Sequence, residues 1–145
     1  MASLSTHVEQ RLRNDPIVWF ITVRPDGRPH VVPVWFFWDG ETFLILSQPN
    51  KQKLRNLRQN RNVMLALDGT GNLGDDVVVV EGTAALLNEP SLSLLSIYPA
   101  IAEKYDVLLK RMNADLQALA ADYSQPIRVT PTRFLVGGEM QSVSA

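Results

Sequence analysis

Residues 17–38 read IVWFITVRPDGRPHVVPVWFFW and predict two antiparallel strands joined by a tight turn. The segment Ile17–Val23 is rich in β-branched and aromatic residues, and His30–Trp38 is apolar at most positions. Between them, Asp26-Gly27 is a dipeptide that favours a hairpin turn. Pro33 has no amide hydrogen, so the second strand is expected at a sheet edge, a bulge or a sheet opening.

The second strand carries apolar side chains on both of its faces. One face has Val31, Pro33, Trp35 and Phe37, and the other has Val32, Val34, Phe36 and Trp38. Successive side chains of a strand point to opposite faces. We therefore expect one face to fill a barrel core and the other to be covered by a helix or by a second subunit.

Four more strands are predicted along the chain: Thr42–Ser47, Val63–Asp68, Val77–Leu87 and Pro126–Phe134. Asp39-Gly40 is a second turn signal, and Gly82 inside a strand indicates a bulge or a close approach of another backbone. Short turns between consecutive strands favour a closed antiparallel sheet. We predict a mainly β protein with helices, an α+β fold whose single domain (residues 1–145) is a six-stranded antiparallel barrel.

Helices are expected in three places. Thr6 and Glu9 have the spacing of a capping box, which predicts a short helix at about residues 3–14. Leucine-rich periodicity predicts a helical insertion at about residues 90–123, interrupted near Pro99. The segment after Gly137, about residues 137–145, is expected to be a mobile tail.

The composition excludes several kinds of site. The chain has no cysteine and two histidines, which rules out disulfides and thiol catalysis and leaves little for a metal centre. No metal site and no catalytic acid or base is predicted. We see no secretory signal and no apolar run long enough for a bilayer, so no membrane association and a cytoplasmic location are expected.

A basic stretch, SQPNKQKLRNLRQNR at residues 47–61, stands out in a chain of net charge -1. No aspartate or glutamate occurs from Thr42 through Leu67. A helix that begins near Asn50 and is capped by it presents free backbone N–H groups to an anion, with Ser47 and Gln48 as further donors. Lys51, Arg55 and Arg58 share one face of that helix. Charge and position alone fit a phosphate site and a solvated basic face equally well.

The order of several motifs resembles the pyridoxamine 5′-phosphate oxidase-like split β-barrel proteins, the FMN-binding split barrel type. These motifs are VWFITVRPDGRP at 18–29, VPVWF at 32–36, WDG at 38–40, SQPNKQKLRNL at 47–57, DG at 68–69, VVVEG at 78–82 and PIRVTPTR at 126–133. Within that family the chain is most similar to the coenzyme F420-dependent branch of flavin/deazaflavin oxidoreductases. A tryptophan that often follows the final strand in this family is replaced here by Phe134 and Leu135.

The resemblance implies a homodimer with cofactor sites at the subunit interface. It implies that a group of polar residues holds the cofactor phosphate: Lys53, with Ser47, Gln48, Lys51, Arg55 and Asn56. It also implies that the backbone of Val32, Pro33, Val34 and Trp35 lines the cofactor ring. Arg133, or acidic residues of the 68–76 loop, would reach across from the partner subunit.

The leading functional hypothesis is an oxidoreductase that uses bound F420 to transfer hydride to an electron-poor small molecule. The first alternative is an FMN-binding oxidase or reductase of the same fold. The second is a non-enzymatic flavin or haem carrier or sensor, for which His30 is the one plausible histidine ligand near the barrel. Nucleic acid is not expected as a partner, because the sequence pI is about 6.1 and no extended basic surface is indicated.

Overall fold

The computed structural model describes residues 4–69, 76–137 and 139–142, the last four by their backbone alone. These residues form five helices and eight strands. The helices are α1 (Thr6–Asn14), α2 (Gln52–Gln59), α3 (Ser91–Ile97), α4 (Ala100–Met112) and α5 (Leu116–Asp122). The strands are β1 (Ile17–Val23), β2 (Pro29–Trp35), β3 (Phe37–Trp38), β4 (Phe43–Ser47), β5 (Asn62–Leu67), β6 (Val78–Leu86), β7 (Gln125–Val136) and β8 (Glu139–Ser142).

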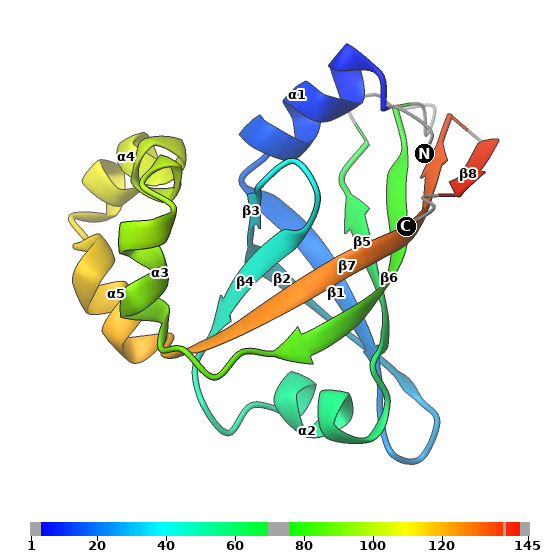
Figure 1. The fold of residues 1–145 in the computed structure, drawn as a ribbon, viewed down its shortest axis with the longest axis horizontal. Coiled ribbons are helices and arrows are strands. Elements are labelled where there is room, and N and C mark those ends of the chain that lie inside the picture. Colours follow the sequence, from blue (N-terminus) through cyan, green and yellow to red (C-terminus); the bar gives the residue numbers. More distant parts are fainter. Residues whose placement is uncertain (1–3, 70–75, 138, 143–145) are drawn as a thin grey trace.

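The strands form one curled antiparallel sheet in the order β2-β1-β5-β6-β7-β4-β3, with β8 paired to β7. The path begins with β2 and ends with β3, which follow each other directly in the chain, so one bent segment serves both ends of the sheet. α1 lies across one end of the curled sheet and α2 across the other (Figure 1). The predicted antiparallel barrel with added helices is confirmed, and Pro33 lies on an edge strand as expected.

The predicted number of six strands is wrong, because the expected strand His30–Trp38 breaks at Phe36 and β8 is an additional strand. The Phe36 N–H donates to the Tyr105 hydroxyl of α4, at 2.9 Å. The Phe36 carbonyl accepts from Lys104 Nζ at 2.8 Å and lies 2.9 Å from the Tyr105 hydroxyl. Side chains of helix α4 therefore make the hydrogen bonds to the Phe36 backbone that a neighbouring strand would otherwise make.

Two other boundaries also differ from expectation. The cap of α1 is Ser5, whose Oγ accepts from the Val8 N–H at 3.2 Å, so Thr6 is the first helical residue rather than a capping-box residue. The tail expected to be mobile contains β8, since residues 139–142 pair with Arg133–Val136. Residues 1–3, 138 and 143–145 of the expected terminal segments lie outside the described residues.

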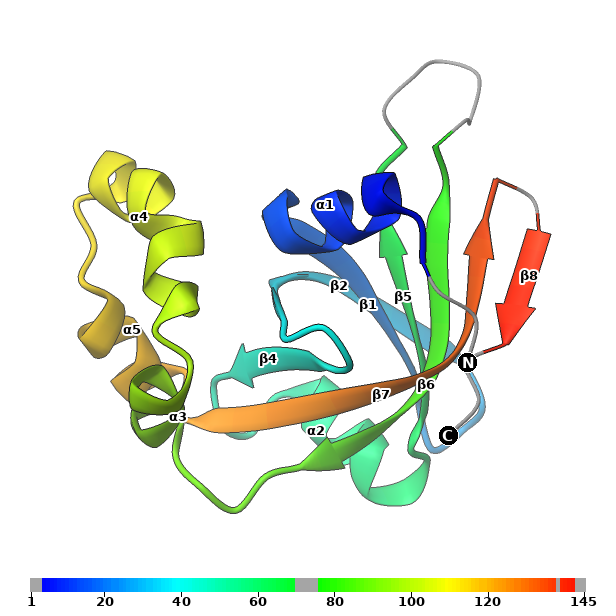
Figure 2. The same ribbon diagram turned by 45° about the horizontal axis from the view of Figure 1, so that its top comes forward.

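Buried apolar side chains form two separate clusters. The barrel cluster fills the curled sheet and includes Val18, Phe20 and Phe134, with contributions from α1 and α2. The second cluster lies between the sheet and the helices α3, α4 and α5, and includes Leu44 of β4 and Tyr105 of α4. These three helices correspond to the insertion expected at about 90–123, and Figure 2 shows them beside the barrel.

Gly82 is a close-approach point, as predicted. The register between β6 and β7 shifts between Glu81 and Gly82, and a Cβ atom built on Gly82 would lie 2.6 Å from the Thr130 carbonyl oxygen. The Thr130 carbonyl belongs to the backbone of β7, which is paired on both sides inside the sheet. It therefore cannot shift to make room for a Cβ atom without disturbing the pairing of β6 and β7.

We expect Gly82→Ala to lower the free energy of unfolding by about 1–3 kcal/mol, because the added methyl group overpacks the β6–β7 contact. Urea unfolding followed by circular dichroism measures this change. Thr83→Ala, on the exposed neighbouring position of the same strand, is the control. Equal stabilities of the two variants would contradict the expected clash.

Candidate functional site

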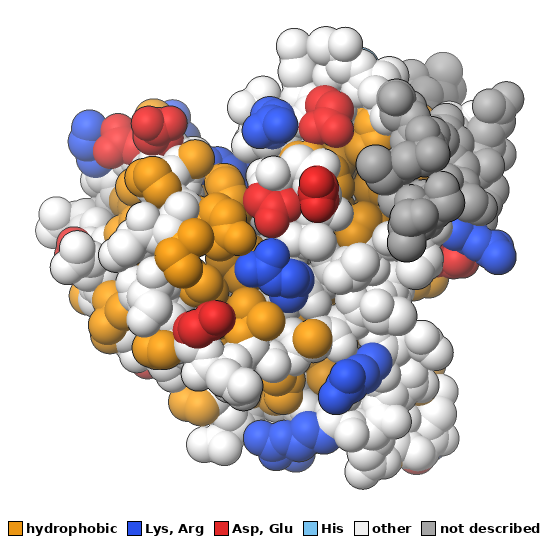
Figure 3. Space-filling view, viewed as in Figure 1, with side chains coloured by type: hydrophobic (Ala, Val, Ile, Leu, Met, Phe, Trp, Pro, Cys, Tyr) orange, Lys and Arg blue, Asp and Glu red, His pale blue; other side chains and the backbone are white. Residues whose placement is uncertain are grey.

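A cavity of about 480 Å³ lies between the barrel and the helical insertion. Its barrel side comes mainly from β2 and β4, with residues of β1, β3 and α2, and its helical side comes from α4, α5 and the residue after α5. The lining side chains are Ile17, Val32, Pro33, Val34, Trp35, Phe36, Phe37, Leu44, Leu46, Gln48, Lys53, Ile101, Tyr105, Met112, Leu116, Leu119, Ala120 and Tyr123. The space-filling view shows hydrophobic side chains gathered over the helical insertion and where it meets the barrel (Figure 3).

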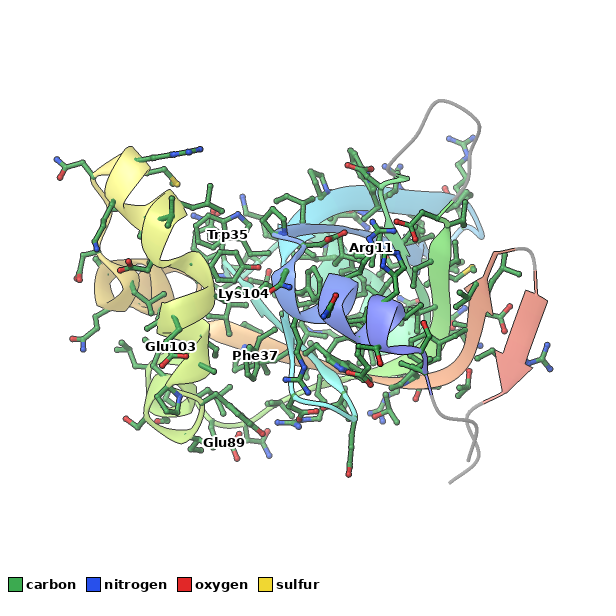
Figure 4. The ribbon with its side chains drawn as sticks, turned by 90° about the horizontal axis from the view of Figure 1, so that it is seen from above. Arg11, Trp35, Phe37, Glu89, Glu103 and Lys104 are labelled. Atoms are coloured by element: carbon green, nitrogen blue, oxygen red, sulfur yellow. The ribbon has the colours of Figure 1, made fainter. Side chains whose placement is uncertain are left out.

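The open edge of β2 borders this cavity. β2 is the first strand of the sheet path and pairs only with β1, so half of its backbone polar groups have no strand partner among the described residues. All four ring-lining residues predicted on β2, 32–35, line the cavity. Trp35 stacks on Tyr105 with ring centroids 4.3 Å apart, and Figure 4 shows it between α4 and the barrel. One indole face is therefore occupied, and the backbone groups of β2 that do not pair with β1 lie on the open edge of the strand.

One end of the cavity is polar, and it is formed by Gln48 and Lys53. Gln48 Nε2 donates to Asp122 Oδ2 of α5 at 2.7 Å, which ties the turn after β4 to the helical insertion. Lys53 is half-buried in the first turn of α2 and makes no ion pair within the described ranges. Burial, and then the charge of Lys51, lower the pKa of Lys53. A cation in this situation favours an anionic ligand.

Two of the residues predicted to hold the phosphate, Ser47 and Asn56, have side chains that are buried and bond within the protein. Ser47 Oγ donates to the Gln48 carbonyl at 2.8 Å. Asn56 Nδ2 donates to Thr22 Oγ1 at 2.8 Å, while its Oδ1 accepts from Gln52. Both side chains are fully buried, and neither lines the cavity. They fix the turn and the first half of α2, and thereby the position of Lys53.

The other predicted basic residues lie on the exposed side of α2. The helix begins at Gln52 with Lys51 as its cap residue, so the expected Asn50 cap is wrong; Asn50 has a φ of 65° in the turn before it. Arg55 Nη1 donates to the Asn50 carbonyl at 2.9 Å. Arg55 therefore holds the turn, and Lys51 and Arg58 are exposed. These side chains are not part of the cavity lining.

The helical wall of the cavity was not predicted. Its residues, such as Met112, Leu116 and Leu119, belong to the helical period from which the insertion at about 90–123 was predicted, with no role at a site assigned to them. Part of that row does pack against β4, but the row also bounds the cavity. The same periodicity indicates both roles, so no local signal separates them.

Within the described residues, no group of three or more acidic, histidine or cysteine side chains could hold a metal ion. None of the described helices combines the length and the apolar character needed to cross a bilayer.

Comparison with known proteins gives a family and a fold. The family model described as "Pyridoxamine 5′-phosphate oxidase" matches residues 4–132. A solved structure named "F420 Reductase" is 29% identical, with a TM-score of 0.66, over 87% of this chain and 94% of that one. General Stress Protein 26 from Bacillus anthracis is 21% identical, with a TM-score of 0.69, over 94% and 95% of the two chains. The haem storage protein HutZ from Vibrio cholerae is 14% identical, with a TM-score of 0.66, over 97% and 95%. No curated protein sequence matches the chain.

Proposed function

Because the chain belongs to the pyridoxamine 5′-phosphate oxidase family, we propose that it is an oxidoreductase that binds coenzyme F420 and reduces an electron-poor small molecule. The observation that carries this proposal is the cavity between β2 and the helical insertion, with apolar walls and, at one end, Lys53, which has no ion-pair partner among the described side chains. The likeness to a solved F420 reductase, at 29% identity, supports the choice of cofactor.

The donor set fits a flat cofactor with an anionic tail. Lys53 would hold the phosphate, and the free backbone groups of β2 would hydrogen-bond the polar edge of the ring. A volume of about 480 Å³ is in the range of small-molecule sites. When bound in its reduced form, a deazaflavin would supply a hydride and be oxidised in doing so; the protein would bind the cofactor, orient it and exclude water. We assign no acid or base to a side chain, and a solvent proton completes the reduction.

We also propose that the protein acts as a homodimer. The outer face of β1 and β2 is apolar and uncovered within the described residues: Val31 is 53% exposed and Trp19 is 38% exposed. Trp19 lies opposite Pro33 in the β1–β2 register. Val31 is two positions from Pro33 on β2, so Trp19, Pro33 and Val31 share one face of the sheet. The helical insertion covers Trp35 and Phe37 at the other end of that face. A second copy of the chain would cover the remainder.

Titration of the apo-protein with F420 and with FMN tests the proposed cofactor. Tighter binding of F420, followed by turnover with a panel of quinones and activated alkenes, is the expected result. Tighter binding of FMN would favour the flavin enzyme of the same fold. Cofactor binding without turnover of any acceptor would favour the carrier.

We expect Lys53→Ala to weaken cofactor binding roughly 5- to 150-fold, since a hydrogen bond to a charged group contributes about 1–3 kcal/mol. Isothermal titration calorimetry measures the dissociation constant. Arg58→Ala removes the same charge from the exposed side of α2 and is the matched control. If both variants weaken binding equally, general electrostatic attraction explains the effect and Lys53 is not a ligand.

A further inference from the structure

One carboxylate lies beside the polar end of the cavity. Gln48 and Lys53 line this end, and Asp122 Oδ2 accepts from Gln48 Nε2 at 2.7 Å. Lys53 is the one charged side chain among the lining residues of the described ranges. Within the same ranges, Asp122 is the only carboxylate that hydrogen-bonds to a lining side chain. The end of the cavity that favours an anion therefore has a negative charge next to it.

The structure holds Asp122 at this place without a cation. Asp122 is the last residue of α5, and Asp115 caps the start of that helix by accepting from the Ala118 N–H at 3.1 Å. Behind the helix end, the buried Ser91 hydroxyl donates to the Tyr123 carbonyl. Asp122 makes no ion pair in the part of the chain that the structure describes. Its partner is the neutral amide of Gln48, so no nearby cation explains its position.

The other charged groups around this end are basic. Lys51 is the exposed residue before α2, and its charge adds to burial in lowering the pKa of Lys53. Burial, and then the charges of Arg24 and Lys53, lower the pKa of His30, so these basic groups lie within electrostatic reach of one another. Such a group of cations attracts a doubly charged anion more strongly than a singly charged one. Asp122 has the opposite effect, because a carboxylate repels each negative charge that a ligand brings.

We propose that Asp122 is a specificity-determining residue that disfavours a doubly charged phosphate monoester relative to a singly charged phosphodiester. This inference rests on the proposed function, because it concerns the anionic group of the cofactor in the same cavity. A monoester such as that of FMN loses a second proton near about pH 6, whereas a diester such as that of F420 keeps a single charge. Asp122 therefore repels the monoester twice and the diester once. A repulsive element of this kind creates specificity without a new attractive contact.

The test compares FMN with riboflavin 5′-(methyl phosphate), in which one added methyl group prevents the second ionisation. Calorimetry measures both dissociation constants at pH 5.0 and pH 8.0 for wild type, Asp122→Asn, Asp122→Glu and Glu103→Gln. Asparagine keeps an oxygen that accepts from Gln48 but removes the charge, and glutamate keeps the charge. Glu103 is exposed on α4 and makes no ion pair among the described residues, so Glu103→Gln is the matched control.

The expected result is a change in the ratio of the two affinities. At pH 8.0, Asp122→Asn should raise the affinity for FMN relative to the methyl ester about 3- to 10-fold, the size of one charge–charge interaction at a partly exposed site. At pH 5.0 FMN carries mostly one charge, so the ratio should change little. Asp122→Glu and Glu103→Gln should keep the wild-type ratio at both pH values. Any steric effect of the methyl group is common to all four proteins and cancels.

Several outcomes overturn the proposal. An unchanged ratio in Asp122→Asn at pH 8.0 would show that Asp122 only ties α5 to the turn after β4. An equal weakening of both ligands would show that the carboxylate positions Gln48 and does not select by charge. An equal rise of the ratio in Asp122→Asn and Glu103→Gln would assign the effect to net charge. If wild type binds neither a flavin nor F420, the proposed function itself fails, and that result is distinct from the other three.

Discussion

Replacing Val31 with aspartate is expected to give a monomer that no longer binds the cofactor tightly. Val31 is 53% exposed on the uncovered face of β1 and β2, and in the proposed homodimer that face is buried. A carboxylate buried there without a partner costs about 3 kcal/mol or more, which raises the dimer dissociation constant at least about 100-fold. Because the resemblance puts the cofactor at the subunit interface, cofactor affinity should fall together with dimerisation.

Sedimentation velocity and cofactor titration on the same preparation test this prediction. Val107→Asp is the matched control, since Val107 is 60% exposed on α4, outside the β1–β2 face. A Val31→Asp protein that stays dimeric would show that the dimer uses another surface. A monomer with unchanged cofactor affinity would show that one subunit completes the site.

The free energy of unfolding of the wild-type protein is expected to rise between pH 7 and pH 10. Lys104→Met is expected to remove most of that rise. Lys104 Nζ lies 2.8 Å from the Phe36 carbonyl and 3.6 Å from the centroid of the Phe36 ring. Burial lowers the pKa of Lys104 from 10.5 to about 7, and the charge of Asp15 offsets part of this change. Figure 4 shows the side chain directed from α4 towards the barrel.

The sign follows from the protons bound in each state. Between pH 7 and pH 10.5 the unfolded chain keeps the Lys104 proton while the folded chain releases it, so the free energy of unfolding increases with pH. The increase is at most about 1.4 kcal/mol per pH unit. Below pH 7 both states hold the proton, and the full cost of burying the ammonium remains.

Urea unfolding at pH 7.0 and pH 9.5 measures this slope. Lys110→Met is the control, because Lys110 is exposed on the same helix and pairs with Asp106 at 2.9 Å. A wild-type slope that survives in Lys104→Met would assign the pH dependence to other groups.

The sequence predicted the parts of the fold that depend on neighbours in the chain. The β1–β2 hairpin follows from Asp26-Gly27 and its apolar flanks, and the close contact at Gly82 follows from a glycine inside a strand. The break at Phe36 could not be predicted, because its cause is Tyr105, a residue 69 positions away. A local pattern contains no information about such a distant hydrogen bond.

The candidate site divides in the same way. Resemblance indicated Gln48 and Lys53, and both line the cavity. It also indicated Ser47 and Asn56, whose type and spacing suit a phosphate but whose side chains bond within the protein. Whether such a side chain lines the cavity or lies in the interior depends on packing between distant segments, which short motifs do not encode.

The two buried clusters have a consequence for how such proteins diverge. The far wall of the cavity comes from one contiguous stretch, residues 101–123, whose packing is separate from the cluster that includes Phe20 and Phe134. Substitutions at lining residues of that stretch outside the barrel cluster, such as Met112, Leu116 and Leu119, can reshape the chamber. New acceptor preferences can therefore evolve, or be selected in the laboratory, through these lining positions while Tyr105 keeps its hydrogen bonds to the Phe36 backbone.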